Sequence, residues 1–302
     1  MKLQEHSTQL PKKIFPDWAR FISAVWQHGM SVYNIQPSKV QYHLTRAFPN
    51  IIDSVSQRNE TSVIRPSAFL ACARQAYIKN VERIAPGKMP DNIGPTFAVG
   101  HLLHELSYAG VNSAIPNGFK VSTELPVTLP EWWPKDKLMF NQDGHVDMLI
   151  EVSDTEEAKK YLPEGILEEQ PKMLIDFKTM GGFSYRKHAK TDYANAVDGF
   201  GYLAQLAVYA DALDIVGNGA LLAGINRDSL IQPLLPRYIA PSVLMREIER
   251  VKLSFDYAEK AKDPGPEFLI RHGSEANFYC GRNGQKGYCP FKKHCKKLDS
   301  NA

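Results

Sequence analysis

Two short apolar segments constrain the fold of this chain more than any other feature of its sequence. They are HVDMLIEV at 145–152 and KMLIDFKT at 172–179, and both have the composition of buried β-strands. A third segment, FKVSTELPVTL at 119–129, alternates apolar and polar residues as a half-buried strand does. The segments ALLAGIN at 220–226 and LLPRYIA at 234–240 indicate two further strands.

Helical signals surround these strands. Apolar residues recur at helical spacing from Ile14 to Met30, and we expect this helix to pack on the main domain. Further helices are expected at 66–81, which Pro66 and Ser67 would open, at 97–111 after a break at Gly94 and Pro95, at about 192–215 and at about 241–262. The acidic segment 151–169 is expected to extend a hairpin or to form a mobile loop.

The order of these elements predicts a mixed α/β fold. Helices come first, followed by three strands, a helix, two strands and a helix, which favours a central mixed sheet flanked by helices. We divide the chain into an N-terminal helical extension at 1–62 and a main domain at 63–302 that includes a C-terminal tail. The length of 302 residues is sufficient for one large domain or two small ones.

Composition excludes several classes of protein and leaves others open. The 43% of hydrophobic and 23% of charged residues are typical of globular chains and argue against a disordered or fibrous one. No apolar run reaches about 18 residues, and the first residues lack the apolar core of a signal peptide. We therefore expect a cytoplasmic protein with no membrane partner, in which thiols stay reduced. The net charge of +3 neither requires nor excludes a nucleic acid.

Acidic residues on the two central strands suggest a cation site. Asp176 and Lys178 are two positions apart, so they share one face of a strand. If the strands pair through a hairpin, Asp147 approaches Asp176, and two such carboxylates repel unless a cation lies between them. Oxygen ligands suit Mg²⁺ or Mn²⁺, and Lys178 could orient or deprotonate a water or stabilise charge on a phosphate. The alternative is an ordinary edge ion pair.

Two predicted helices carry candidate partners of these carboxylates. Gly100 and His104 share a helix face, so His104 is a candidate third ligand that would favour Mn²⁺; the alternative is a core or surface histidine. Its neighbours His101 and Glu105 are weaker candidates. Gln205 and Tyr209 lie one turn apart and could hydrogen-bond a phosphate or Lys178, although an amphipathic helix produces the same pattern. These two residues are included in the candidate catalytic set, which also comprises Asp147, Asp176 and Lys178.

In chain order, these residues form Gly100-x-x-x-His104, Gly144-x-x-Asp147, Asp176-x-Lys178 and Gln205-x-x-x-Tyr209. The ordered set resembles the PD-(D/E)XK nuclease superfamily, in its RecB-like exonuclease branch. The resemblance implies a restriction-endonuclease-like fold in which Lys178 assists the attacking water. It also implies a set of metal ligands, namely His104, Asp147, Asp176 and the backbone carbonyl of Phe177. Glu124 matches an acid often found on the preceding strand of that family.

The four cysteines are Cys72, Cys280, Cys289 and Cys295. A disulfide is disfavoured in a reducing compartment, and zinc or an iron–sulfur cluster is the alternative. No CxxC pair occurs, although such pairs are usual in zinc ribbons. A distant first cysteine and a C-terminal trio resemble the iron–sulfur staple of AddB-type nucleases and CRISPR-associated adaptation nucleases, which implies a [4Fe–4S] cluster. Zinc and unligated thiols stay open, and the eight residues between Cys280 and Cys289 exceed the family's usual spacing.

The resemblance implies a metal-dependent DNA exonuclease that acts on single- or double-stranded ends in recombination, repair or replication, in a bacterial, archaeal or phage-infected cell. Basic residues of the tail and one of the predicted helix 66–81 could bind phosphates: Lys286, Lys292, Lys293, Lys296, Lys297 and Arg74. No Gly-x-x-x-x-Gly-Lys-Ser/Thr helicase motif is present. The alternative function is a partner-dependent DNA-processing or DNA-binding subunit, in CRISPR spacer trimming or a recombination complex, with little activity alone.

Overall fold

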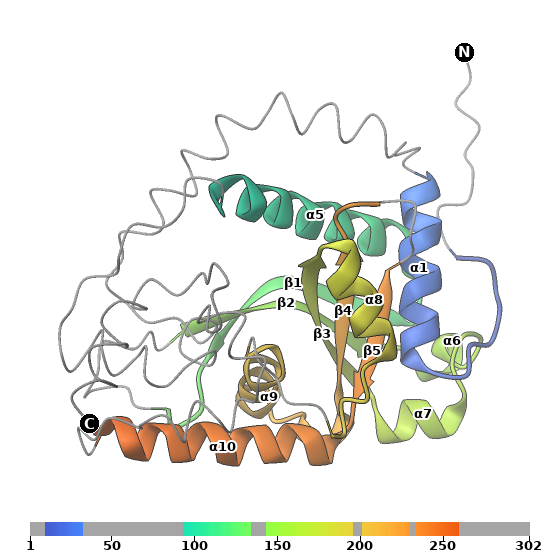
Figure 1. Ribbon diagram of the computed structural model, residues 1–302. Helices are drawn as coiled ribbons and strands as arrows, with labels where there is room; N and C mark the ends of the chain where they lie inside the picture. The colour runs from blue at the N-terminus through green and yellow to red at the C-terminus, as the bar shows by residue number, and fades with distance from the viewer. Residues whose placement is uncertain (1–9, 33–92, 134–142, 196–200, 230–233, 260–302) are drawn as a thin grey trace.

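The computed structural model describes residues 10–32, 93–133, 143–195, 201–229 and 234–259. These residues form a five-stranded mixed sheet in the order β1-β2-β3-β4-β5. The strands are β1 (Phe119–Thr128), β2 (Asp143–Val152), β3 (Lys172–Met180), β4 (Ala220–Asn226) and β5 (Leu235–Ile239). Neighbouring strands are antiparallel except β3 and β4, which are parallel. The predicted mixed α/β fold, with a central mixed sheet flanked by helices, is confirmed (Figure 1).

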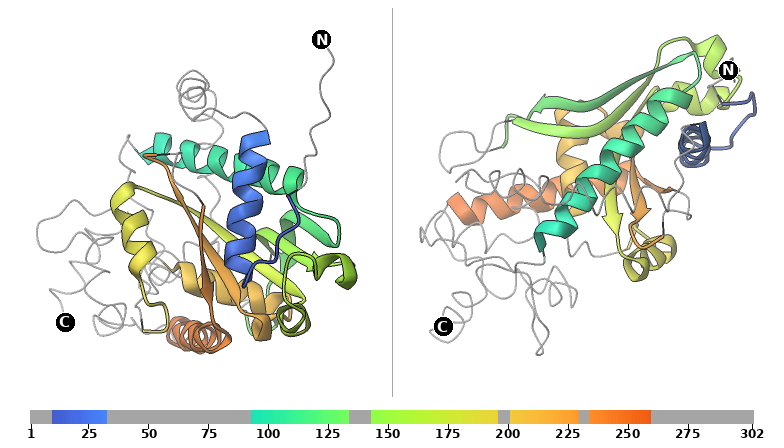
Figure 2. Two further views of the ribbon diagram at one scale, coloured as in Figure 1. Left: turned by 90° about the vertical axis from the view of Figure 1, so that its right-hand side faces the viewer. Right: turned by 90° about the horizontal axis from the view of Figure 1, so that it is seen from above.

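Helices cover both faces of this sheet. The first face carries α1 (Trp18–Val32) and α5 (Ile93–Ala114), and the second carries α9 (Tyr202–Ala212) and α10 (Pro241–Glu259) (Figures 1 and 2). Alternate residues of β3 divide between two apolar clusters, because successive side chains of a strand point to opposite faces. Ile175 and Phe177 join the α1/α5 cluster, whereas Leu174 joins the α9/α10 cluster.

The acidic segment between β2 and β3 is helical, so the expectation of an extended hairpin or a mobile loop was wrong. It contains α6 (Thr155–Ala158) and α7 (Glu164–Glu169). The Asp154 side chain caps α6 by accepting hydrogen bonds from the backbone N–H groups of Glu156 and Glu157, which satisfies donors that a helix start leaves unpaired. Apolar side chains between the acids anchor the segment in the core: Ala158, Tyr161, Leu162 and Leu167.

Two helix boundaries also differ from the expectation. Helix α5 begins at Ile93, so Gly94 and Pro95 do not precede the helix but lie in its first turn, where a proline removes no helical hydrogen bond. The region expected as one helix at 192–215 instead starts with a turn, in which the Asp192 carboxylate accepts from the Ala194 N–H. Helix α9 begins only after Gly201, whose φ of 74° is left-handed.

A helix that the sequence reading did not anticipate directly follows β3. This is α8 (Gly182–Lys190), which contacts β3 and β4 and buries Tyr185 and His188. A short 3-10 turn, η1 (Val216–Asn218), precedes β4. The chain from 201 onward otherwise follows the expected order of helix, two strands and helix. None of the helices in the described ranges is long and apolar enough to cross a membrane.

Helix α1 is part of the main core. Trp18 is 1% exposed and Phe21 and Ile22 are fully buried, in one cluster with apolar residues of β2, β3 and β4. The hydroxyl of Ser23 also donates to the Leu234 carbonyl oxygen at 3.0 Å, which ties α1 to the start of β5. The helix therefore packs on the main domain as predicted. The expected boundary at 62–63, the helix at 66–81, the four cysteines and the basic tail all lie outside the described residues.

The burial of Trp18 predicts a large stability effect from a single substitution at the N-terminus. We expect Trp18→Ala to lower the free energy of unfolding by about 3–5 kcal/mol, because it removes a large side chain from a closed core. The exposed Arg20, two positions away, supplies the control: Arg20→Ala should change it by about 0.5 kcal/mol or less. Urea titrations followed by circular dichroism measure both. Equal effects of the two substitutions would contradict the placement of α1 in the core.

Candidate functional site

The candidate site lies where strands β2 and β3 separate. Their last registered pair is Met148 with Ile175, and continuing the register by one position sets Asp147 opposite Asp176. Beyond that point the Phe177 N–H donates to the carboxylate of Asp147 at 2.7 Å, so a side chain replaces the neighbouring backbone as acceptor. Strand β3 stays paired with β4 as far as Met180. The expected approach of Asp147 and Asp176 is thus confirmed, at a fork rather than within a regular ladder.

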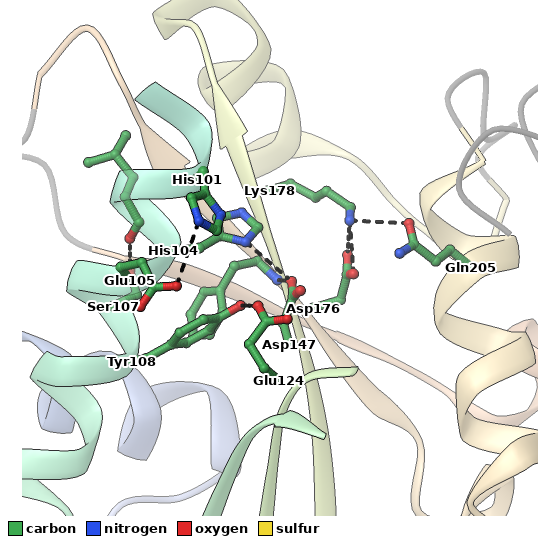
Figure 3. A network of polar contacts seen from close by, with 12 residues as sticks. His101, His104, Glu105, Ser107, Tyr108, Glu124, Asp147, Asp176, Lys178 and Gln205 are labelled. Atoms are coloured by element: carbon green, nitrogen blue, oxygen red, sulfur yellow. Dashed lines mark hydrogen bonds and ion pairs between the residues drawn. The ribbon is translucent and has the colours of Figure 1, made fainter. Parts of the chain in front are cut away.

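Side chains reach this fork from helices on both faces of the sheet. Figure 3 shows His104 of α5 on one side and Gln205 of α9 on the other, with Asp147 and Asp176 between them. Asp176 is 2% exposed, and its side chain points with that of Lys178 toward α9, as the two-residue spacing predicted. Residues of four sequence motifs therefore meet at one place in the fold.

Lys178 is held by three groups. Its ammonium nitrogen Nζ lies 2.8 Å from Oδ1 of Asp176 and 3.3 Å from Oε1 of Gln205. The nitrogen also lies 5.2 Å from the centroid of the Tyr202 ring, within the range of a cation–π contact. The proposed contact between Gln205 and the lysine is thus confirmed. Tyr202 was missed, although its position one turn before Gln205 on the same helix was the available signal.

His104 occupies the opposite side of the fork. Its Nδ1 lies 3.7 Å from Oδ2 of Asp147. One helical turn further along, the Tyr108 hydroxyl donates to the carboxylate of Glu124 at 2.7 Å. Glu124 has a left-handed φ of 48°, unusual for a residue with a side chain, and it faces the β2 position of Asp147. The sequence reading missed Tyr108, which shares the face of His104 at four-residue spacing.

Gly144 and Tyr209 join two of the motifs through van der Waals contact. A Cβ atom at Gly144 would lie 2.5 Å from Cε1 of the Tyr209 ring, closer than real carbon atoms approach. Tyr209 is 5% exposed, and Gln205 lies within hydrogen-bonding reach of its hydroxyl. The ring thus packs directly on the backbone of β2, three residues before Asp147. By contrast, a Cβ at Gly100 would lie 3.6 Å from Oγ1 of Thr179, an ordinary van der Waals distance. A larger residue than glycine would therefore fit at position 100 without a clash with Thr179.

Burial and mutual repulsion shift the acidity of these groups. Burial, assisted by the charge of Asp147, raises the pKa of Asp176 to about 6, although Lys178 opposes the shift. Burial also raises the pKa of Asp147. For Lys178 burial acts in the opposite direction, yet the two carboxylates outweigh it and hold the lysine pKa above its usual range. Burial and then Lys178 lower the pKa of His104 to about 4, so the imidazole is neutral at pH 7.

The donor set suits a hard divalent cation, although the side chains contact one another in this arrangement. Within the described ranges, no three His, Cys, Asp or Glu side chains are arranged to hold an ion as they stand. Both carboxylate oxygens of Asp176 lie 2.8 Å from Nζ of Lys178, so this carboxylate has a cationic partner in the structure. The carboxylates of Asp176 and Asp147 beside a neutral imidazole are ligands that Mg²⁺ or Mn²⁺ accepts. The chemistry of these residues therefore fits such an ion.

The remaining predicted residues lie on the surface of α5, on the backbone of β3 or outside the described residues. His101 and Glu105 lie 3.9 Å apart, and about half of each side chain is exposed. They form a helix-surface pair, consistent with their weaker standing as candidates. Phe177 reaches the site through its backbone N–H, and its ring packs near those of His104 and Tyr108. The cysteines and the basic residues of the tail lie outside the described residues.

No protein-family model and no curated protein sequence matches this chain. Among solved structures, one titled "Crystal structure of SSO0001" is similar at 14% sequence identity and a TM-score of 0.40. That similarity covers 86% of this chain and 97% of the other.

The contact between Gly144 and Tyr209 predicts that the smallest added side chain disturbs the site. We expect Gly144→Ala to lower the free energy of unfolding by about 1–3 kcal/mol, because its methyl group collides with the buried ring. Gly165→Ala is the matched control, since nothing lies within 4 Å of a Cβ at that exposed helical position. The control should be neutral or slightly stabilising. Chemical denaturation of both variants tests the contact, which is refuted if they are equally stable.

The acidity of Asp176 predicts a pH-dependent gain from removing its charge. A carboxyl whose pKa is about 6 when folded and about 4 when unfolded binds a proton on folding, so its charged form costs stability above pH 6. In EDTA we expect Asp176→Asn to exceed the wild type in free energy of unfolding by about 1–3 kcal/mol at pH 7.5. The difference should vanish as the pH falls through 6 toward 4.

The control for this measurement is Asp214→Asn, at an exposed position of the chain. This variant removes an exposed carboxylate and thus measures the effect of the lost charge alone. Denaturant titrations at pH 4.5, 6 and 7.5 provide the comparison. A gain for Asp176→Asn that is constant across this range would show that the carboxylate is not destabilised by its surroundings.

Proposed function

We propose that this protein is a metal-dependent deoxyribonuclease of the PD-(D/E)XK superfamily, in its RecB-like branch, which hydrolyses phosphodiester bonds at DNA ends. The observation that carries the proposal is the position of Lys178, bound by Asp176 and Gln205 beside the carboxylate of Asp147. An ordinary ion pair between Asp176 and Lys178 requires neither the carboxylate of Asp147 nor the amide of Gln205. A site that receives a cation and a phosphodiester accounts for all of them.

His104, Asp147, Asp176 and the carbonyl of Phe177 would hold Mg²⁺ or Mn²⁺. When bound, such an ion supplies Lewis-acid polarisation of the phosphodiester and neutralises its developing charge. The protonation states of the ligand residues also favour binding of the cation. His104 is neutral at pH 7 and has a lone pair to donate, and Asp176 is mostly ionised above pH 6.

The charge of Lys178 defines its part in the reaction. Because the neighbouring carboxylates hold its pKa above the usual range, the ammonium group stays protonated at physiological pH. It therefore acts as a fixed cation that orients a water and stabilises negative charge on the phosphodiester, rather than as a base that removes the proton. Gln205 and the Tyr202 ring position this ammonium group from α9. Tyr209 keeps α9 at a fixed distance from β2.

The same proposal covers the predicted tail and its cofactor. Cys72, Cys280, Cys289 and Cys295 would ligate a [4Fe–4S] cluster, with zinc as the lesser alternative, and the lysines of the tail would bind phosphates of the DNA. Ligation of residues so distant in sequence would contribute folding free energy by closing a very long loop. Recombination or CRISPR-adaptation proteins are the partners that such a nuclease would work with.

The test of the proposal is cleavage of end-labelled linear DNA and of circular DNA by anaerobically purified protein. Mg²⁺ or Mn²⁺ should support loss of the linear substrate, and EDTA should abolish it. We expect Lys178→Ala and Asp147→Ala to lower the rate by a factor on the order of 100 to 1000, since each removes charge or ligation at the reacting phosphate. The position of the label that is lost gives the polarity.

Lys172→Ala is the matched control, because Lys172 lies at the other end of β3 and pairs with Glu151. Its rate should stay within about twofold of the wild type. Cleavage of circles would reassign the protein as an endonuclease. A folded protein that cuts no substrate, with cluster colour present, would overturn the proposal in favour of a partner-dependent or DNA-binding subunit.

A further inference from the structure

An aromatic and three cationic side chains lie along one outward side of α8. They occur at helix positions i, i+3, i+4 and i+7, the spacing that aligns side chains on one side of a helix. These residues are Phe183, Arg186, Lys187 and Lys190, and all four are exposed. Phe183 is 76% exposed, the largest fraction among the exposed large apolar side chains in the described ranges. We refer to these four residues as the α8 stripe.

Contacts along the whole helix fix the direction of the α8 stripe. At the start of α8, the Gly182 N–H donates to the carboxylate of Asp228 at 2.6 Å. On its inner side, Nε2 of the buried His188 donates to the Leu235 carbonyl oxygen at 3.0 Å. At its end, the guanidinium of Arg237 donates to two backbone carbonyls at 2.9 Å each. The helix is thus held on the sheet, and the stripe points away from it.

The α8 stripe begins beside the candidate site. Only Gly181 separates β3 from α8, so Phe183 follows Lys178 by five residues. Gly224 is the register neighbour of Lys178 on β4, and a Cβ at Gly224 would lie 2.7 Å from Cδ2 of His188. Helix α8 therefore rests directly on the strand position next to Lys178. Figures 1 and 2 show it beginning at the same end of β3.

We propose that the α8 stripe is a binding track for one strand of DNA on its way to the site. Phe183 stacks on an unpaired base near the reacting phosphate, and the three cations pair with the phosphates that follow. This inference rests on the proposed nuclease function and names the form of its substrate. It does not depend on the cysteines or the tail.

The chemistry of the stripe favours a single strand over a duplex. Stacking on an aromatic ring requires a base whose face is open, which a single strand offers and the interior of a duplex does not. The sequence of α8, GFSYRKHAK, contains basic residues and no acidic one. A helix of nine residues is about 14 Å long, so its exposed side can follow more than one phosphate of a strand.

The test is equilibrium binding of the full chain to labelled DNA in EDTA, so that no strand is cut. Three probes of equal length are used: an oligothymidylate, an abasic strand and a duplex. Fluorescence anisotropy between about 50 and 300 mM salt gives the dissociation constant and its salt dependence. Phe183→Ala should weaken binding of oligothymidylate on the order of tenfold and leave the abasic strand unchanged. Phe183→Trp should keep the wild-type affinity.

The cations are tested together by the triple variant Arg186→Gln, Lys187→Gln, Lys190→Gln. It should flatten the slope of log affinity against log salt by about 2 for the single strand, since each lost contact contributes about 0.7. The control is Lys12→Gln, Lys13→Gln, Arg20→Gln, which removes the same charge at exposed positions before and within α1. The control should leave the slope unchanged.

An unchanged slope in the α8 triple variant, or equal flattening in the control, overturns the track. Equal loss of duplex and single-strand binding, with no effect of Phe183→Ala, overturns the single-strand assignment. The two proposals can fail separately. If the wild type cuts DNA and Lys178→Ala does not, while the α8 variants bind normally, only the track is wrong. If binding depends on the stripe but no metal supports cleavage, the nuclease proposal is wrong.

Discussion

The bond from the Phe177 N–H to the Asp147 carboxylate is the interaction on which the arrangement of the site depends. A backbone donor next to a strand ordinarily pairs with the neighbouring backbone, and here a side chain takes that place. The substitution allows β2 and β3 to part without leaving the donor unpaired. It also fixes the carboxylate in the gap, where helices on both faces of the sheet can reach it. One hydrogen bond thus both opens the sheet and places an acid in the opening.

The described side chains in the opening carry more negative than positive charge. Asp176 is buried and Asp147 is mostly buried, and among the described residues Lys178 is the cation that compensates both carboxylates. Since burial raises the pKa of both acids, the apo site carries an electrostatic cost that a divalent cation would relieve. Gln205 and Tyr202 add a dipole and a ring to the lysine but no charge. The two carboxylates and the lysine all lie on strands β2 and β3, and the residues of α9 only position the lysine.

The strands and the shared face of Asp176 and Lys178 could be predicted from the sequence, because buried strands are short apolar runs with a period of two. The fork could not, since it depends on where the pairing of β2 and β3 stops, and no local pattern encodes that. Helix α8 was missed because its buried side consists of Tyr185 and His188, too few apolar residues for a helical period. The contact of Tyr202 with Lys178 could not be predicted, because it exists only once α9 packs beside β3.

The hydrogen bond between Ser23 and Leu234 joins residues 211 positions apart. During synthesis, the apolar side of α1 leaves the ribosome long before the strand that it packs against exists. At 5–20 residues per second, Ser23 waits roughly 10 to 40 s for Leu234. The rings of Trp18 and Phe21 meet Phe119 and Tyr161 earlier in synthesis, so the aromatic side of α1 can be covered before the chain reaches β5, and the bond to Leu234 forms last.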